Sequence, residues 1–174
     1  MNIIIYGSQY GSAEKYAKEL AKITKSDCKS YEDIKHLDDY DTIIYIGALY
    51  AGGALGMKKT FKNLINIKNK KIIIVTVGLA DTTDKAYTDV IKSGLKKQLS
   101  DEVYNTAHIF HLRGEIDYSK LNFKHKTMMH LLYKQVVKLP DEKKTADDIA
   151  MIETYNKHVS FIDYNSLKPI IQCI

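Results

Sequence analysis

The chain has 174 residues, 45% of them hydrophobic and 27% charged, which is typical of a globular protein and excludes a disordered chain. This length suits one hydrophobic core, so we expect residues 1–174 to form a single domain. The formal net charge is +5, but Arg113 is the only arginine and no nucleic-acid-reading motif is present. We therefore expect no nucleic-acid partner.

The sequence also bears on location. The most apolar stretch, residues 72–80, is about half as long as a membrane-spanning helix. The first residues already read as a strand, with no basic segment before them, so we expect no secretory signal. Cys28 and Cys173 lack the spacing of metal or redox motifs, as is typical of free thiols in a reducing cytosol. We expect a cytoplasmic protein without a bound metal.

Strand and helix patterns alternate along the first two thirds of the chain. Continuous apolar runs predict buried strands, and apolar residues at helical spacing predict helices. The predicted strands cover residues 2–6, 27–30, 42–47, 71–78 and 108–112, and the predicted helices cover residues 12–24, with Ser12 as N-cap, 57–65 and 83–99. This alternation predicts an α/β fold with a parallel sheet covered on both faces. Ligands of such sheets bind at the carboxyl ends of the strands.

Beyond residue 112 the pattern is mainly helical. A long helix is predicted over residues 118–139, ended by Pro140. A second, over residues 145–155, opens with the Thr145-x-x-Asp148 pattern of a capping box. A last helix begins near Asp163 as N-cap and accommodates Pro169 in its early turns. We treat residues 118–157 as an appended helical segment.

The turn after the first strand, YGSQYGSAEK, carries the first indication of a ligand. Gly7 and Gly11 are not followed by the third glycine of a dinucleotide fingerprint, and the Gly-Lys-Ser/Thr of a nucleoside-triphosphate loop is missing. Small and hydroxyl residues before a helix can still bind a phosphate monoester through backbone N–H groups and the helix dipole. An ordinary βα turn fits the same residues. The candidate residues are Ser8, Gln9, Tyr10, Gly11, Ser12 and Ala13.

At this turn the chain resembles the flavodoxin family, whose first loop reads Ser/Thr-x-Thr-Gly-x-Thr around the phosphate of FMN. Ser8, Gly11 and Ser12 match this pattern, whereas Tyr10 and Ala13 replace the two usual threonines. The resemblance covers residues 1–114. It implies FMN as cofactor and a flavodoxin-like, doubly wound, five-stranded parallel sheet of order 2-1-3-4-5, here with extra C-terminal helices.

The resemblance also implies that two further loops wrap the isoalloxazine ring of FMN. Glycines in these loops allow close approach of the backbone, and Tyr50 offers an aromatic face. The second loop contains Ala48, Leu49, Tyr50, Ala51, Gly52 and Gly53, and the third contains Val77, Gly78, Leu79, Ala80 and Asp81.

Charge and the C-terminal segment favour an enzyme over an electron carrier. Carrier flavodoxins are acidic and use tryptophan beside the flavin, whereas this chain is basic, has no tryptophan and has no acid between Asp41 and Asp81. Ammonium groups near a flavin stabilise its reduced anion, which favours two-electron reduction. After the last strand, Leu112-Arg113 is followed by a predicted helix rich in lysine and aromatic residues. In this pattern the segment is similar to that of menaquinone-dependent protoporphyrinogen IX dehydrogenases. This implies an FMN-dependent oxidoreductase linked to protoporphyrinogen IX or a quinone.

Residues of that segment have both functional and structural interpretations. Arg113 can pair with a substrate carboxylate, or bridge to Glu115 or Asp117. His125 and His130 can exchange protons, or lie on an ordinary helix surface. The apolar residues of the predicted 118–139 helix form either a buried stripe or a face exposed to a quinone or to the inner face of the membrane, with lysines reaching anionic lipid.

Two other functions are open at this point. One is an electron-transfer flavodoxin that passes electrons to a protein partner and has no substrate of its own. The other is a flavin-free regulatory domain on the same fold, since fold does not determine function.

Overall fold

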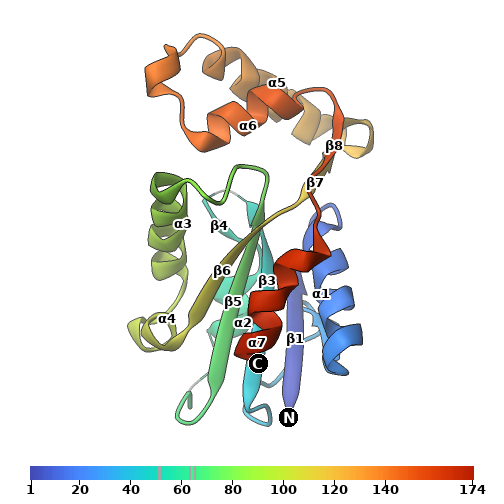
Figure 1. The fold of residues 1–174 in the computed structure, drawn as a ribbon, viewed down its shortest axis with the longest axis vertical. Coiled ribbons are helices and arrows are strands. Elements are labelled where there is room, and N and C mark those ends of the chain that lie inside the picture. Colours follow the sequence, from blue (N-terminus) through green and yellow to red (C-terminus); the bar gives the residue numbers. More distant parts are fainter. Residues whose placement is uncertain (51, 63, 65) are drawn as a thin grey trace.

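The structure, a computed structural model, describes residues 1–50, 52–62, 64 and 66–174 (Figure 1). Within these residues, five parallel strands form the central sheet in the order β2-β1-β3-β5-β6. They are β1 (Asn2–Gly7), β2 (Asp27–Ser30), β3 (Thr42–Tyr50), β5 (Lys71–Gly78) and β6 (His108–Arg113). The short β4 (Gly53–Ala54) pairs antiparallel with the end of β3. The predicted fold class and strand order are confirmed.

Helices cover both faces of the sheet, because its central strands are apolar on both faces. Alternate residues of β1 point to opposite sides, with Ile3 and Ile5 in one apolar cluster and Ile4 in the other. The first cluster is covered by α2 (Met57–Phe61), α3 (Lys85–Gln98) and α4 (Asp101–Thr106). The second is covered by α1 (Ser12–Thr24) and α7 (Lys168–Cys173). Each fully buried isoleucine contributes roughly 1.5–3 kcal/mol.

A second group of elements lies beyond the carboxyl ends of the strands (Figure 1). Here β7 (Glu115–Asp117) pairs antiparallel with β8 (His158–Ser160). Between them, residues 118–157 form what we call the cap. The cap contains η1 (Tyr118–Lys120), α5 (Phe123–Val136), η2 (Asp141–Lys143) and α6 (Ala146–Thr154). After β8 the chain returns to the sheet through η3 (Tyr164–Leu167) and α7.

Several predicted boundaries are wrong. The helix predicted from residue 118 begins only at Phe123, because the Asn122 side chain caps it by accepting from the His125 N–H at 2.8 Å. Ser12 is not an N-cap: Gly11 holds that position with φ 99°, and Ser12 is the first helical residue. The helix predicted over residues 57–65 ends at Phe61 in α2; of its remaining positions, 63 and 65 lie outside the described residues.

Other predicted features are confirmed and some elements were missed. The Thr145–Asp148 capping box is present and opens α6. Asp163 is an N-cap, although of η3, and Pro169 lies in the first turn of α7. The β7–β8 pair and α4 were not predicted. In the described part of the chain, none of the helices has the length and apolar character that a membrane crossing requires.

The end of β1 lies unusually close to the turn before α2. The carbonyl oxygen of Leu55 accepts a hydrogen bond from the Tyr45 hydroxyl, and a Cβ on Gly7 would lie 2.0 Å from that same oxygen. Because glycine has no side chain, the end of β1 can pack directly against the backbone of Leu55, and the first loop begins at this point.

Gly7→Ala is expected to destabilise the protein by about 1–3 kcal/mol, because backbone atoms of the Leu55 turn would have to move. Urea unfolding followed by circular dichroism measures this change. The control Val90→Ala removes an exposed side chain and should change stability by less than about 0.5 kcal/mol. Equal stability of the Gly7 variant and the wild type would contradict the close approach.

Candidate functional site

A cavity of about 340 Å³ lies where β1, β3 and β5 end, between the sheet and the cap. Its volume falls within the range of small-molecule sites, and its walls are mainly apolar. From the loops after the strands it is lined by Ser8, Gln9, Tyr10, Ser12, Ala48, Leu49, Tyr50, Val77, Gly78 and Leu79. The three loops predicted to bind one ligand therefore meet around one cavity.

Not every predicted residue lines the cavity. Gly11, Ala13, Gly52, Gly53, Ala80 and Asp81 lie outside its lining, and Ala51 lies outside the described residues. Ala13, which stands where flavodoxins have threonine, is fully buried in the core beneath α1. Gly53 packs against Gln98 of α3, whose amide bonds the backbone of Ala54. The Asp81 carboxylate accepts hydrogen bonds from Thr83 and so shapes its own turn.

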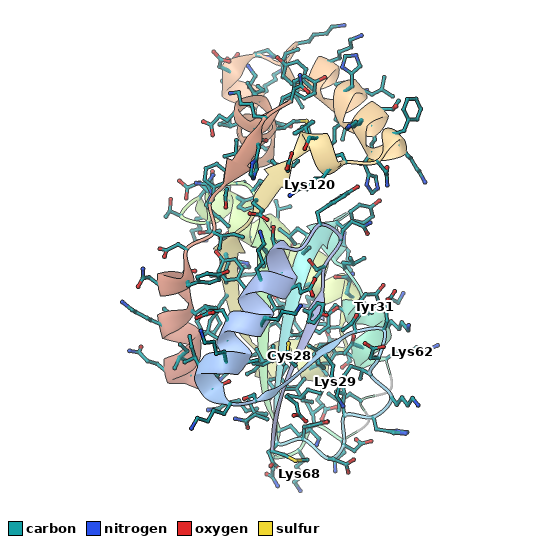
Figure 2. The ribbon with its side chains drawn as sticks, turned by 90° about the vertical axis from the view of Figure 1, so that its right-hand side faces the viewer. Cys28, Lys29, Tyr31, Lys62, Lys68 and Lys120 are labelled. Carbon is teal, nitrogen blue, oxygen red and sulfur yellow. The ribbon has the colours of Figure 1, made fainter. Side chains whose placement is uncertain are left out.

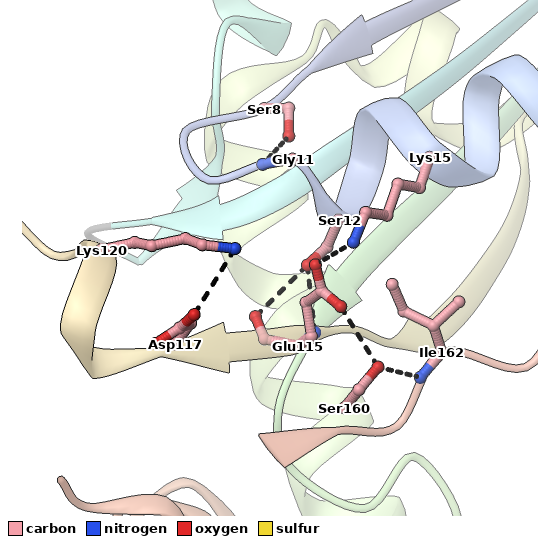
Figure 3. A network of polar contacts seen from close by, with 9 residues as sticks. All are labelled: Ser8, Gly11, Ser12, Lys15, Glu115, Asp117, Lys120, Ser160 and Ile162. Atoms are coloured by element: carbon pink, nitrogen blue, oxygen red, sulfur yellow. Dashed lines mark hydrogen bonds and ion pairs between the residues drawn. The ribbon is translucent and has the colours of Figure 1, made fainter. Parts of the chain in front are cut away.

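The first loop presents the amino terminus of α1 to the cavity. Gly11 adopts φ 99°, and its N–H donates to the Ser8 hydroxyl at 3.0 Å. The Ser12 hydroxyl has another partner: it accepts from the Glu115 N–H at 3.0 Å and donates to the Glu115 carbonyl at 3.3 Å (Figure 3). Of the two hydroxyls predicted at a phosphate, Ser12 is thus used to join α1 to β7.

His125 connects the cap to two of the loops. It is a buried residue of α5, and both of its ring nitrogens meet tyrosine hydroxyls. Nδ1 bonds Tyr10 of the first loop, and Nε2 lies 3.2 Å from the hydroxyl of Tyr50 of the second loop. Both tyrosine rings contact the imidazole edge-on, with centroid distances of 5.6 and 5.9 Å. His125 therefore holds α5 over the cavity.

Arg113 supports the third loop from outside the cavity lining. Its Nε and Nη2 donate to the Leu79 carbonyl at 2.9 and 2.8 Å, and its guanidinium lies 3.7 Å from the centroid of the Phe161 ring. The predicted bridge to Glu115 or Asp117 is wrong, because those carboxylates pair with Lys15 and Lys120 instead. Arg113 fixes the backbone of Leu79, which does line the cavity.

The roof of the cavity consists mostly of residues that sequence reasoning did not assign to a site. It is formed by Leu121, Met128 and Met129 near or on α5 and by Ala150 and Met151 on α6. The sequence left Met128 and Met129 open between a buried stripe and a face exposed to a quinone or the membrane, and it gave no role to Leu121, Ala150 and Met151. Asp147 and Tyr87 also line the cavity. Burial, and then the neighbouring Asp148, raise the pKa of the Asp147 carboxyl above its usual value.

The charge predicted to surround the ligand is not at the cavity. Of the described residues, no lysine or arginine lines it, and its carboxylates are Glu115 and Asp147. Figure 2 shows Lys62 and Lys68 of the acid-free stretch on the core, away from the cap that carries Lys120. The electrostatic argument for two-electron reduction is therefore not supported by the structure. Nor do three or more His, Cys, Asp or Glu side chains converge as metal ligands would among the described residues.

Glu115 ties the first loop to the base of the cap. Its carboxylate pairs with Lys15 of α1 and accepts from the Ser160 hydroxyl of β8 at 3.2 Å (Figure 3). Next to it, a Cβ on Gly114 would lie 2.9–3.0 Å from Val77 and Ser12. The hydrogen bond from Lys15 lowers the pKa of Glu115 below its usual value. The base of the cap at β7 is thus joined to α1 by the Glu115–Lys15 ion pair and by the hydrogen bonds of the Ser12 hydroxyl with the Glu115 backbone.

Comparison with known proteins agrees with this arrangement. The family model described as flavodoxin domain matches residues 3–143. The chain therefore belongs to the flavodoxin domain family. No curated protein sequence matches it.

The solved structures that resemble this chain in fold have low sequence identity to it. Flavodoxin 1 from Bacillus cereus is 16% identical over 64% of this chain and 83% of its own, with a TM-score of 0.45. A flavodoxin mutant from Fusobacterium nucleatum, bound to flavin mononucleotide, is 17% identical over 70% of this chain and 72% of its own, with a TM-score of 0.46. A flavoprotein from Lactobacillus acidophilus in complex with FMN is 14% identical over 64% of this chain and 91% of its own, with a TM-score of 0.42.

Glu115→Gln is expected to lower the free energy of unfolding at pH 7 by up to about 1 kcal/mol, because Lys15 is half exposed and solvent screens the pair. The folded-state pKa of Glu115 is lowered, so its contribution is present above the unfolded pKa near 4.3. That contribution is lost as the pH falls through the folded pKa. Urea midpoints of both proteins should therefore differ at pH 7 and converge once the pH has fallen below the folded-state pKa of Glu115.

The matched control is Asp89→Asn, which breaks an ion pair with Lys85 on the exposed surface of α3. Its urea midpoint at pH 7 should move less than that of Glu115→Gln, because both partners of this pair are more than half exposed. A Glu115 variant that behaves like this control would contradict a structural role for the contact.

Proposed function

We propose that the chain binds FMN in the cavity under the cap and works as an FMN-dependent oxidoreductase. The observation that carries the proposal is that all three loops predicted for FMN line a single cavity at the carboxyl ends of β1, β3 and β5. Membership of the flavodoxin domain family supports FMN as the cofactor. When bound, FMN supplies the redox chemistry, and the protein supplies binding, orientation and exclusion of water.

The first loop fits a phosphate. The first turn of α1 has backbone N–H groups without helical partners, and these favour an anion. Among the described residues, apart from Gly11 and its two chain neighbours, no heavy atom lies within 4 Å of the position that a Cβ on Gly11 would occupy, so the left-handed turn leaves open space beside this helix end. Ser8, whose hydroxyl is already oriented by the Gly11 N–H, can donate its proton to a phosphate oxygen.

The rest of the cavity fits a flat aromatic ring. Leu49 and Tyr50 line one part of the wall, Val77 and Leu79 another, and the cap covers them. An apolar cover strengthens the polar contacts beneath it by excluding water. It also leaves less of the ligand open to a large partner protein, and for this reason we favour an enzyme with a small substrate over an electron carrier.

We extend the proposal to the substrate class. Methionines on both cap helices line the roof, and such side chains adapt to large apolar ligands. These features fit a flat, largely apolar redox partner, as the resemblance to quinone-linked protoporphyrinogen IX dehydrogenases implies. Asp147, with its raised pKa, can hold a proton at the edge of such a substrate site.

FMN titration, followed by flavin fluorescence, is the first test, and wild-type protein is expected to bind FMN tightly enough to purify yellow. His125→Ala removes both tyrosine contacts and should weaken FMN binding about tenfold, since two hydrogen bonds of about 0.5–1.5 kcal/mol orient the loops. The control His130→Ala changes an exposed histidine of the same helix that bonds Tyr155 outside the cavity, and should bind FMN like the wild type.

If the protein is still colourless after incubation with excess FMN and removal of the unbound FMN, the proposal is overturned and a flavin-free function is left. Anaerobic titration of the yellow protein with a reductant separates the other two functions. Direct bleaching in one two-electron step supports the oxidoreductase, and oxidation by a quinone should then be assayed. Two well-separated one-electron steps would indicate an electron carrier instead.

A further inference from the structure

The outward face of α5 exposes an unusual amount of apolar surface. Phe123 is 86% exposed and Leu131 57%, with Met128 and Leu132 also exposed beside them. With Thr127, these side chains line a shallow groove on the side of α5 that does not carry His125. We call this surface the α5 outer face. Contiguous exposed apolar patches on soluble proteins mark binding surfaces, whereas isolated exposed residues do not.

The segment that carries the α5 outer face contains charged residues of one sign. Residues 118–140 contain no acidic residue. Lys124 lines the outer groove, Lys134 lies further along α5, and Lys138 follows the helix. Lys126 is also on α5, but it lines a different groove beside Asp117 and donates to the Ser119 carbonyl at 3.3 Å. In the part of the chain that the structure describes, none of these four lysines forms an ion pair. Their positive charge is therefore available to a partner.

We propose that the α5 outer face binds the surface of an anionic lipid bilayer. A helix that presents exposed apolar side chains, in a segment with lysines and no acidic residue, fits the boundary between lipid headgroups and acyl chains. The phenylalanine and leucine enter the acyl region, while the lysine side chains extend to the phosphates. A second copy of this chain fits less well, because two such faces would bring lysines against lysines without acidic partners.

The α5 outer face also adjoins the cavity. Met128 lines both the outer groove and the cavity roof. Met128 is therefore the point at which an apolar molecule dissolved in the bilayer would enter the cavity. This route for the substrate rests on the proposed function, whereas lipid binding itself does not require FMN.

Co-sedimentation with vesicles tests the proposal, with FMN-loaded and FMN-free protein measured separately. Wild-type protein should bind phosphatidylglycerol vesicles at least tenfold more tightly than phosphatidylcholine vesicles, with or without FMN. Each lysine near an anionic surface strengthens binding roughly fivefold, so Lys124→Gln with Lys134→Gln should weaken binding by more than tenfold. Raising the salt concentration should do the same to the wild type.

The apolar contribution is tested with Phe123→Ser and Leu131→Ser together, which should weaken binding to phosphatidylglycerol vesicles by at least tenfold. Both side chains are exposed, so the variant should keep its circular dichroism spectrum and melting temperature. The control Val90→Ser changes a valine on α3 that is 68% exposed and should bind vesicles like the wild type.

Three outcomes would overturn the proposal. They are absence of binding to anionic vesicles, equal binding by the Phe123/Leu131 variant and the wild type, and a wild-type dimer in solution that the same variant dissociates. If FMN does not bind but vesicles do, the proposed function fails and the lipid surface stands. If the protein binds FMN but does not bind vesicles, the proposed lipid surface fails and the proposed function stands.

Discussion

The structure depends on the burial of β1, β3 and β5 from both sides at once. Ile3 and Ile4 are neighbours in the chain but lie in different apolar clusters, and both are fully buried. Strands of this kind need helices on both faces, and helices that link parallel strands place the loops after β1, β3 and β5 at the same edge. The cavity lies at this edge because the strands are apolar on both faces, and not because any one loop residue directs it there.

This constraint explains what the sequence could predict. Continuous apolar runs such as residues 71–78 fit only strands that are covered on both faces. From these runs the sequence predicts the strands, their order and the loops at their carboxyl ends. Contacts between residues that are far apart in the chain do not follow. Ser12 looked like an N-cap or a phosphate ligand, and only its neighbour Glu115, 103 residues away, gives its hydroxyl another use. Likewise, Arg113 stood out as the single arginine, but its partner is a backbone carbonyl, which has no sequence pattern.

The cap shows a different limit of sequence reasoning. Apolar residues occur around most of α5, so their periodicity indicated a packed helix without saying which side was packed. In the structure His125 and Met129 face the loops, whereas Phe123 and Leu131 face outward. The two short strands β7 and β8 were missed because three residues are too few to show alternation. Yet these strands decide where α5 lies.

The cap leaves and rejoins the core at neighbouring points. The Phe161 N–H donates to the Gly114 carbonyl at 2.9 Å, and Glu115 pairs with Ser160. In topological terms the cap is an insertion with adjacent ends, placed between β6 and the helix that completes one face of the sheet. Leu167 and Ile170 reach that face only after the whole cap has been synthesised. On the ribosome, therefore, this face of the sheet remains partly uncovered until the cap has emerged.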